Sequence, residues 1–156
     1  MKISTRRVLK ALDLRARDGG GEDGGIFRYP DQNGKMWLAF HWDGAGINQN
    51  GEIVLIEEEA IPFSQIHIQG HLSRVSVMQL MGERVDKLIW LVPSGSQLHL
   101  DCIVLPWVRF LQEMTQKRLP KIEYRNYEGC LVGRLGDAEI VSHAKSVTRR
   151  KFAVRM

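Results

Sequence analysis

Short stretches in which apolar and polar residues alternate recur along the chain, and this period of two is typical of β-strands with one buried face. The segment 35–42 is the clearest, and the apolar residues on one of its faces are Met36, Leu38, Phe40 and Trp42. It follows Asn33-Gly34, a dipeptide that favours a tight hairpin with the segment 25–29. Further strands are predicted over 52–57, 63–69, 71–80, 86–92, 97–105, 121–125 and 130–135.

Other segments place apolar residues three and four positions apart, which is the period of an amphipathic helix. The three predicted helices span residues 5–17, 106–117 and 137–150. Pro106 suits the first position of the second helix, in which Trp107 is expected to be buried against the sheet with Phe110 and Leu111. Alternation resumes over 152–156, which predicts a short edge strand at the end of the chain.

Together these patterns predict an α+β fold: an antiparallel sheet, or a partly closed barrel, of about seven to nine strands with about three helices. The 156 residues suit a single domain, 1–156, that is large enough to bury an apolar core. Residues 19–25 include five glycines and form a connector, because no Gly-Lys-Ser/Thr follows to make a phosphate loop. Glycines also mark 43–51 as a loop.

The charge distribution changes the picture most. The net charge is +4, but residues 1–17 carry six basic side chains against one acid, and residues 145–156 carry five against none. The rest of the chain holds 11 bases and 17 acids. Cationic ends on an anionic body indicate either a polyanionic partner or pairing within the chain.

These basic ends lead to the predicted function, a small non-catalytic nucleic-acid-associated protein that binds phosphates without reading bases. The predicted contact residues are Arg6, Arg7, Lys10, Arg17, Lys145, Arg149, Arg150, Lys151 and Arg155. The alternative is a protein-binding module, such as an assembly subunit, inhibitor or adaptor. Its basic ends would dock on an acidic partner, or on residues 57–59 of a second copy in a homo-oligomer. Within the chain, the acidic run 57–59 is expected to be a solvated strand end or a partner for a cationic terminus.

Histidine and carboxylate spacing offers weaker candidates for chemistry. His67 and His71 are four apart, which does not place them on one face of the predicted strands. His99 and Asp101 are two apart and share a strand face, an arrangement that could bind a metal or orient a base, although a water-facing polar surface is favoured. Asp101 and the segment 123–125 resemble the pattern of metal-dependent nucleases that use an Asp on one strand and Glu-x-Lys on the next, but Arg125 replaces the expected lysine. No catalytic residue, metal ligand or cofactor is therefore predicted, and the chain is not expected to be an enzyme.

Aromatic and sulfur side chains support ordinary packing. Tyr29, Trp37 and Trp42 could stack on bases, but core and hairpin packing is the better interpretation. Cys102 and Cys130 lie in apolar runs and are predicted to be buried, reduced thiols. The longest apolar run is too short to span a membrane, and the basic start lacks the apolar stretch of a signal peptide. We therefore expect a cytoplasmic protein that does not bind membranes.

Overall fold

The computed structural model describes residues 2–17, 25–59, 64–93 and 95–135. In chain order its elements are α1 (Ile3–Ala11), β1 (Arg15–Ala16), β2 (Ile26–Pro30), β3 (Met36–His41), β4 (Gly44–Ile47), β5 (Ile53–Glu58), α2 (Gln65–Leu80), β6 (Val85–Leu91), α3 (Gln97–Thr115), β7 (Lys121–Arg125) and β8 (Leu131–Arg134). The predicted helix 137–150, the strand 152–156 and most of the connector 19–25 lie outside the described residues.

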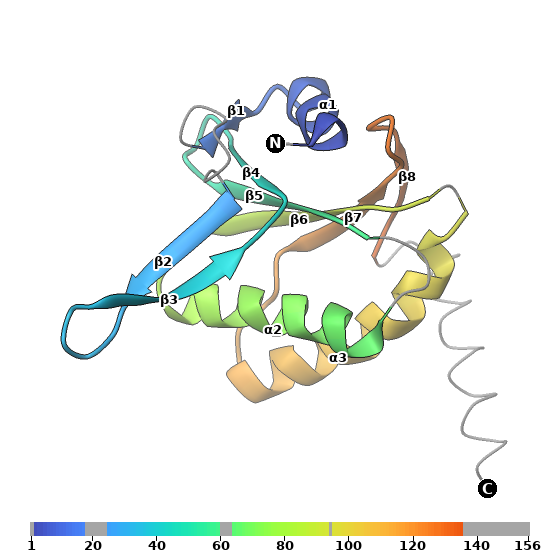
Figure 1. The fold of residues 1–156 in the computed structure, drawn as a ribbon. Coiled ribbons are helices and arrows are strands. Elements are labelled where there is room, and N and C mark those ends of the chain that lie inside the picture. Colours follow the sequence, from blue (N-terminus) through green and yellow to red (C-terminus); the bar gives the residue numbers. More distant parts are fainter. Residues whose placement is uncertain (1, 18–24, 60–63, 94, 136–156) are drawn as a thin grey trace, which may run out of the picture.

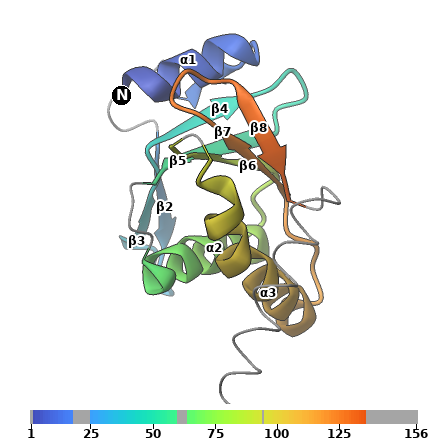
Figure 2. The ribbon, with the colours of Figure 1, turned by 90° about the vertical axis from the view of Figure 1, so that its right-hand side faces the viewer.

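An open six-stranded sheet in the order β1-β4-β5-β6-β7-β8 forms the centre of the described fold. Its middle strands β5, β6 and β7 are parallel and its outer pairs are antiparallel. The crossover helices α2 and α3 cover one face, while α1 lies on the other (Figures 1 and 2). The predicted α+β class is thus confirmed, and so is the hairpin of β2 and β3, which forms a separate two-stranded sheet. The described strands form an open, mixed sheet and no closed barrel.

The segment 63–80, predicted as two strands, instead contains helix α2. Its buried apolar residues are spaced three and four apart, as a helix requires, and are Ile68, Leu72, Val75 and Met78. The exposed face is also partly apolar, with Ile66 and Leu80 in solvent. Because both faces carry apolar residues, the amphipathic contrast is weak and the helical period is hidden in the sequence.

The segment 97–105, also predicted as a strand, forms the first half of α3, so the predicted helix 106–117 is only the second half. Pro106 therefore sits inside the helix and not at its start. Trp107 is half-buried and donates from Nε1 to Ser73 Oγ at 3.2 Å. Phe110 remains 45% exposed, so the expected burial of these aromatic residues beside Leu111 is only partly correct.

The segment 43–51, predicted as a loop, contains strand β4, which pairs with β1 and β5 and carries two glycines packed closely against α1. A Cβ atom on Gly46 would lie 2.6 Å from Leu9 Cδ2, and one on Gly44 would collide with a side chain of α1. Their missing side chains let α1 pack directly on the sheet. Helix α1 also ends at Ala11, earlier than expected, since Asp13 adopts a left-handed conformation with φ of 52° and turns the chain into β1.

Two smaller expectations meet different outcomes. Cys130 is exposed in the turn before β8, and Cys102 is half-buried in α3, so the prediction that both thiols are buried is wrong. Among the described residues no helix combines the length and apolarity needed to cross a membrane.

Candidate metal centre

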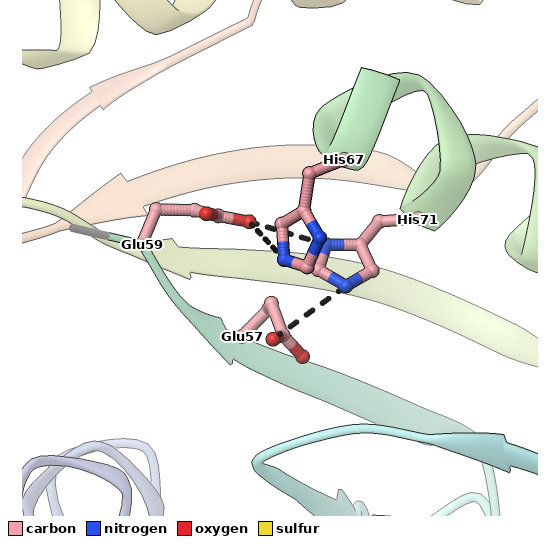
Figure 3. Close-up of side chains that lie close together, drawn as sticks. All are labelled: Glu57, Glu59, His67 and His71. Carbon is pink, nitrogen blue, oxygen red and sulfur yellow. Dashed lines mark hydrogen bonds and ion pairs between the residues drawn. The ribbon is translucent and has the colours of Figure 1, made fainter. Parts of the chain in front are cut away.

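The carboxyl end of β5 carries the acidic run whose side chains alternate between the two faces of the sheet. Glu57 and Glu59 point toward α2 and are almost fully buried (Figure 3). Glu58, between them, points to the other face, where it accepts a hydrogen bond from Ser4 Oγ and pairs with Lys2 Nζ at 3.1 Å. The two-residue period of a strand therefore delivers two carboxylates to the same buried place.

The first turns of α2 bring two imidazoles to these carboxylates. Ser64 caps the helix by accepting a hydrogen bond from the backbone N–H of His67. His67 and His71 are four residues apart, so they lie on one face of the helix, and their rings meet edge to face at 4.3 Å. The prediction that their spacing separates them is wrong because the segment is helical.

The contacts between the two elements are short. His71 Nδ1 lies 3.1 Å from Glu59 Oε1, and His71 Nε2 lies 3.7 Å from Glu57 Oε1. His67 Nε2 is 4.0 Å from Glu59 Oε1. Each of the four residues offers one atom that could bind a metal, and these four atoms all lie within 4.8 Å of one another. We call Glu57, Glu59, His67 and His71 the Glu/His centre.

Burial makes the electrostatics of this centre unusual. Desolvation, followed by the nearby charges of Asp43 and Glu59, raises the pKa of Glu57 to about 8, although the backbone N–H of Asp43 donates to its Oε2 at 3.2 Å. A divalent cation would offset the repulsion between these buried carboxylates. His67, whose side chain is 57% exposed, forms the solvent side of the centre.

Surrounding groups hold Glu59 in place from two further directions. The indole N–H of the fully buried Trp90 donates to Glu59 Oε1 at 3.2 Å. The hydroxyl of Tyr127, in the turn between β7 and β8, donates to the backbone carbonyl of Glu59 at 2.8 Å. These contacts give the carboxylate and the backbone of Glu59 a fixed orientation beside the imidazoles.

The acidic run thus differs from the expected solvated strand end, because two of its three carboxylates are buried. The alternative, an internal partner for a cationic terminus, is correct for Lys2, which pairs with both Glu58 and Asp43. Partial burial lowers the pKa of Lys2, but hydrogen bonds from Lys2 to these two carboxylates outweigh it and raise the pKa overall.

The predicted phosphate-binding residues differ in their exposure and in their contacts. Arg6, Arg7 and Lys10 are exposed on α1. Arg17 is half-buried and donates to the carbonyl of Ile26 at 2.6 Å. Its guanidinium lies 3.8 Å from the ring centre of Phe27, so the Arg17 side chain packs on strand β2. The remaining predicted residues lie outside the described part of the chain and are Lys145, Arg149, Arg150, Lys151 and Arg155.

The exposed cations of α1 lie on the opposite face of the sheet from the Glu/His centre (Figure 1). Arg7 Nη1 lies 3.7 Å from Glu128 Oε2 and donates to the carbonyl of Tyr127 at 3.4 Å. The Tyr127 hydroxyl in turn contacts only the backbone carbonyl of Glu59, so Arg7 makes no contact with the side chains of the centre.

The histidine and nuclease patterns singled out in the sequence do not form sites. His99 and Asp101 lie on helix α3, where residues two apart point in different directions; His99 is exposed, and Asp101 is buried and accepts from the Tyr124 hydroxyl at 2.6 Å. Glu123 projects from the opposite face of β7, where it pairs with Lys87 at 3.1 Å. Asp101 and Glu123 therefore cannot share a metal.

Two of the three aromatic residues considered for base stacking pack in the core, as the sequence predicted. Tyr29 and Trp42 are both buried, and Trp42 lies 5.5 Å from the His71 ring, so neither presents a face for base stacking. The side chain of Trp37 lies outside the described part of the structure. Core packing is thus the correct interpretation for the two described aromatics.

Sequence reasoning missed the Glu/His centre because it treated 63–80 as strands. The spacing of His67 and His71, read on a helix, is the signal that could have found it, together with the Glu57 and Glu59 alternation on β5. Neither a scan of protein-family models nor a search of curated proteins finds a match to this chain.

Proposed function

We propose that this protein binds a divalent transition-metal ion in the Glu/His centre and acts there on the phosphodiester backbone of nucleic acid. The observation that carries the proposal is the convergence of two carboxylates and two imidazoles at the end of β5. The exposed cations of α1, on the other face of the sheet (Figure 1), support the nucleic-acid part of the proposal. The proposal adds catalysis to the nucleic-acid binding expected from the charge distribution. A cytoplasmic location, where nucleic acid is accessible, belongs to the same proposal.

The donor set selects a class of metal. Imidazole nitrogen with carboxylate oxygen suits Zn²⁺, Mn²⁺, Fe²⁺ and Co²⁺, whereas Mg²⁺ and Ca²⁺ prefer sites made of oxygen alone. Neither described cysteine is a member of the centre, so thiolate ligation is not part of it. Of these four metals, we expect zinc to bind more tightly than manganese, since affinities for a given nitrogen and oxygen site are lowest for manganese.

The exposed cations of α1 favour a phosphate backbone as the substrate. Arg6, Arg7 and Lys10 project from α1, and Arg7 donates to the backbone carbonyl of Tyr127 at the end of this face. Several arginine and lysine side chains in a row bind successive phosphates and give strongly salt-dependent affinity. Sequence-specific base contacts are not required for this mode of binding.

Phosphodiester hydrolysis is the reaction class that fits these parts. A metal ion with an open position polarises a phosphate oxygen and lowers the pKa of bound water. The water oxygen forms a new bond to phosphorus, one P–O ester bond breaks, and the proton released from water is taken up by the leaving oxygen. The chain's own residues hold the ion, orient its ligands and neutralise the backbone charge along α1.

Metal binding is tested first, by titrating the metal-free protein with Zn²⁺ and Mn²⁺ in a calorimeter and measuring metal content after dialysis. One equivalent should bind to the parent protein. The His67→Ala protein should bind at least tenfold more weakly, because it loses an exposed ligand without disturbing the core. His99→Ala, which changes an exposed histidine outside the centre, is the matched control and should bind like the parent.

Nucleic-acid binding is tested with a variant in which Arg6, Arg7 and Lys10 are all alanine. Its affinity for duplex or single-stranded nucleic acid should fall, and its slope of log affinity against log salt should flatten by about two to three. A control variant removes three exposed arginines elsewhere, Arg28, Arg74 and Arg109. Equal losses in both variants would mean that α1 has no special role.

Hydrolysis is tested by incubating labelled nucleic acid with the metal-loaded protein and separating the products by size. Cleavage should require the metal and should be lost in His67→Ala but retained in His99→Ala. Metal binding and nucleic-acid binding without cleavage would remove the catalytic part of the proposal. If the α1 variant instead loses an acidic protein partner and the parent binds no nucleic acid, the protein-binding alternative is correct.

A further inference from the structure

The hydrogen-bond donors around Glu59 determine which nitrogen of His71 carries a proton. An indole N–H can only donate and a carboxylate can only accept. Glu59 Oε1 accepts from Trp90 Nε1 at 3.2 Å and lies 3.1 Å from His71 Nδ1. With Glu59 as a carboxylate, both contacts are hydrogen bonds only if His71 carries its proton on Nδ1.

The opposite nitrogen of His71 is then the one that can bind a metal. In the neutral ring with a proton on Nδ1, Nε2 carries the lone pair. His71 Nε2 lies 3.7 Å from Glu57 Oε1, which is too long for a good hydrogen bond. Zinc binds nitrogen and oxygen ligands at about 2.0–2.2 Å, so two ligands of one ion are commonly about 3–4 Å apart. The gap between Nε2 and Oε1 therefore has the width of a metal site.

Burial makes this arrangement hard to change. Glu59, His71 and Trp90 are each almost completely excluded from solvent, so neither the imidazole nor the carboxylate has room to rotate away. The Trp42 ring, 5.5 Å away, packs beside the His71 ring. Tyr127 holds the backbone of Glu59 from the other side of the strand end.

We propose that the metal ion binds between Nε2 of His71 and the carboxylate of Glu57, and that Glu59 is a positioning residue. Glu59 holds the Nδ1–H form of His71 and is itself oriented by Trp90. This inference rests on the proposed metal-binding function and assigns roles within the Glu/His centre. His67, at the solvent side, supplies the third protein ligand and leaves room for water or a phosphate oxygen.

The assignment is tested by nitrogen-15 NMR of the histidine rings in the metal-free protein and after addition of one equivalent of Zn²⁺. Without metal, His71 should show a protonated Nδ1 and an unprotonated Nε2. With zinc, the Nε2 resonance should shift while Nδ1 keeps its proton. A proton on Nε2 in the metal-free protein, or a zinc-induced shift at Nδ1, would overturn the assignment.

The same spectra separate this inference from the proposed function. If zinc shifts no histidine resonance, the proposed metal centre itself fails, whatever the tautomer of His71. If zinc shifts His67 and His71 but through Nδ1 of His71, the centre is correct and the role of Glu59 is wrong.

Two substitutions on the same strand provide a second test by zinc titration. Glu59→Gln should weaken zinc binding about 10- to 100-fold with one equivalent still bound, as expected for the loss of an outer-shell partner. Glu57→Gln, which removes a ligand, should weaken it further. The control is Glu58→Gln, whose side chain lies on the opposite face and which should bind zinc like the parent. Equal losses for Glu57→Gln and Glu59→Gln would make Glu59 a ligand and refute the positioning role.

Discussion

The raised pKa of Glu57 predicts how the stability of the metal-free protein depends on pH. In the unfolded chain this carboxyl has an ordinary pKa of 4.5, whereas in the folded protein burial and the charges of Asp43 and Glu59 raise it to about 8. Between these two values the folded state holds a proton that the unfolded state has released. The contribution of Glu57 to the free energy of unfolding is therefore complete below pH 4.5 and falls as pH rises toward 8.

The size of the effect follows from the same two pKa values. Each pH unit across this interval corresponds to about 1.4 kcal/mol, so the full contribution is at most about 5 kcal/mol. The Glu57 side chain is only 11% exposed, so solvent screening reduces this little. Replacing Glu57 by Gln keeps an acceptor for the backbone N–H of Asp43 but removes the titration.

The assay is urea unfolding of metal-free parent and Glu57→Gln protein at several pH values from 5 to 8. The parent should lose stability relative to the variant as pH rises, by about 1 kcal/mol or more per unit. Glu113→Gln, which changes an exposed carboxylate on α3, is the control and should follow the parent. If parent and Glu57→Gln lose stability in parallel across this range, Glu57 is ionised in the folded protein and the electrostatic reasoning is wrong.

Three further predictions concern the fold. Leu72→Ala should lower the free energy of unfolding in urea by about 2–5 kcal/mol, because Leu72 is fully buried on α2. Val77→Ala, on the exposed side of α2, should change it by less than about 0.5 kcal/mol, and equal effects would mean that α2 is misplaced. Gly46→Ala should lower the melting temperature, because overpacking against α1 reduces the free energy of unfolding by about 1–3 kcal/mol. Gly70→Ala, in an open position within α2, should instead raise the free energy of unfolding by about 0.5–1 kcal/mol. Tyr124→Phe removes a buried hydrogen bond to the carboxylate on α3 and should cost about 1–3 kcal/mol in the same measurement; an unchanged value would show that this bond is not formed in solution.

Local sequence determined the elements whose signals depend on near neighbours. The hairpin of β2 and β3 follows from Asn33-Gly34, and the hairpin of β7 and β8 follows from two apolar runs around the turn at 126–129. The predicted strands 52–57 and 86–92 correspond to β5 and β6, whose apolar runs are bounded by polar residues, as is typical of strands buried on both faces. Each of these signals is contained within a few residues of the element that it predicts.

The helices α2 and α3 depended on the tertiary structure. Ile66 and Leu80 are exposed on α2, so the periodicity of its buried residues could not be separated from that of its surface. In α3 the apolar run before Pro106 resembles a strand, and only packing on β6 and β7 shows that the helix continues through the proline. Propensity and patterning are weak where both faces of a helix are apolar.

The candidate site was also predictable only in part from the sequence. The sequence placed Glu57 and Glu59 two apart on a strand, and so on one face, but it could not show that this face is buried or what covers it. His67 and His71 meet these carboxylates only because α2 is a helix that crosses back over β5. Convergence of side chains from two elements is a property of their packing, and no local pattern encodes it. The sequence by itself therefore determined the two hairpins, the strands β5 and β6 and the uneven charge, while the tertiary structure alone assembled the centre.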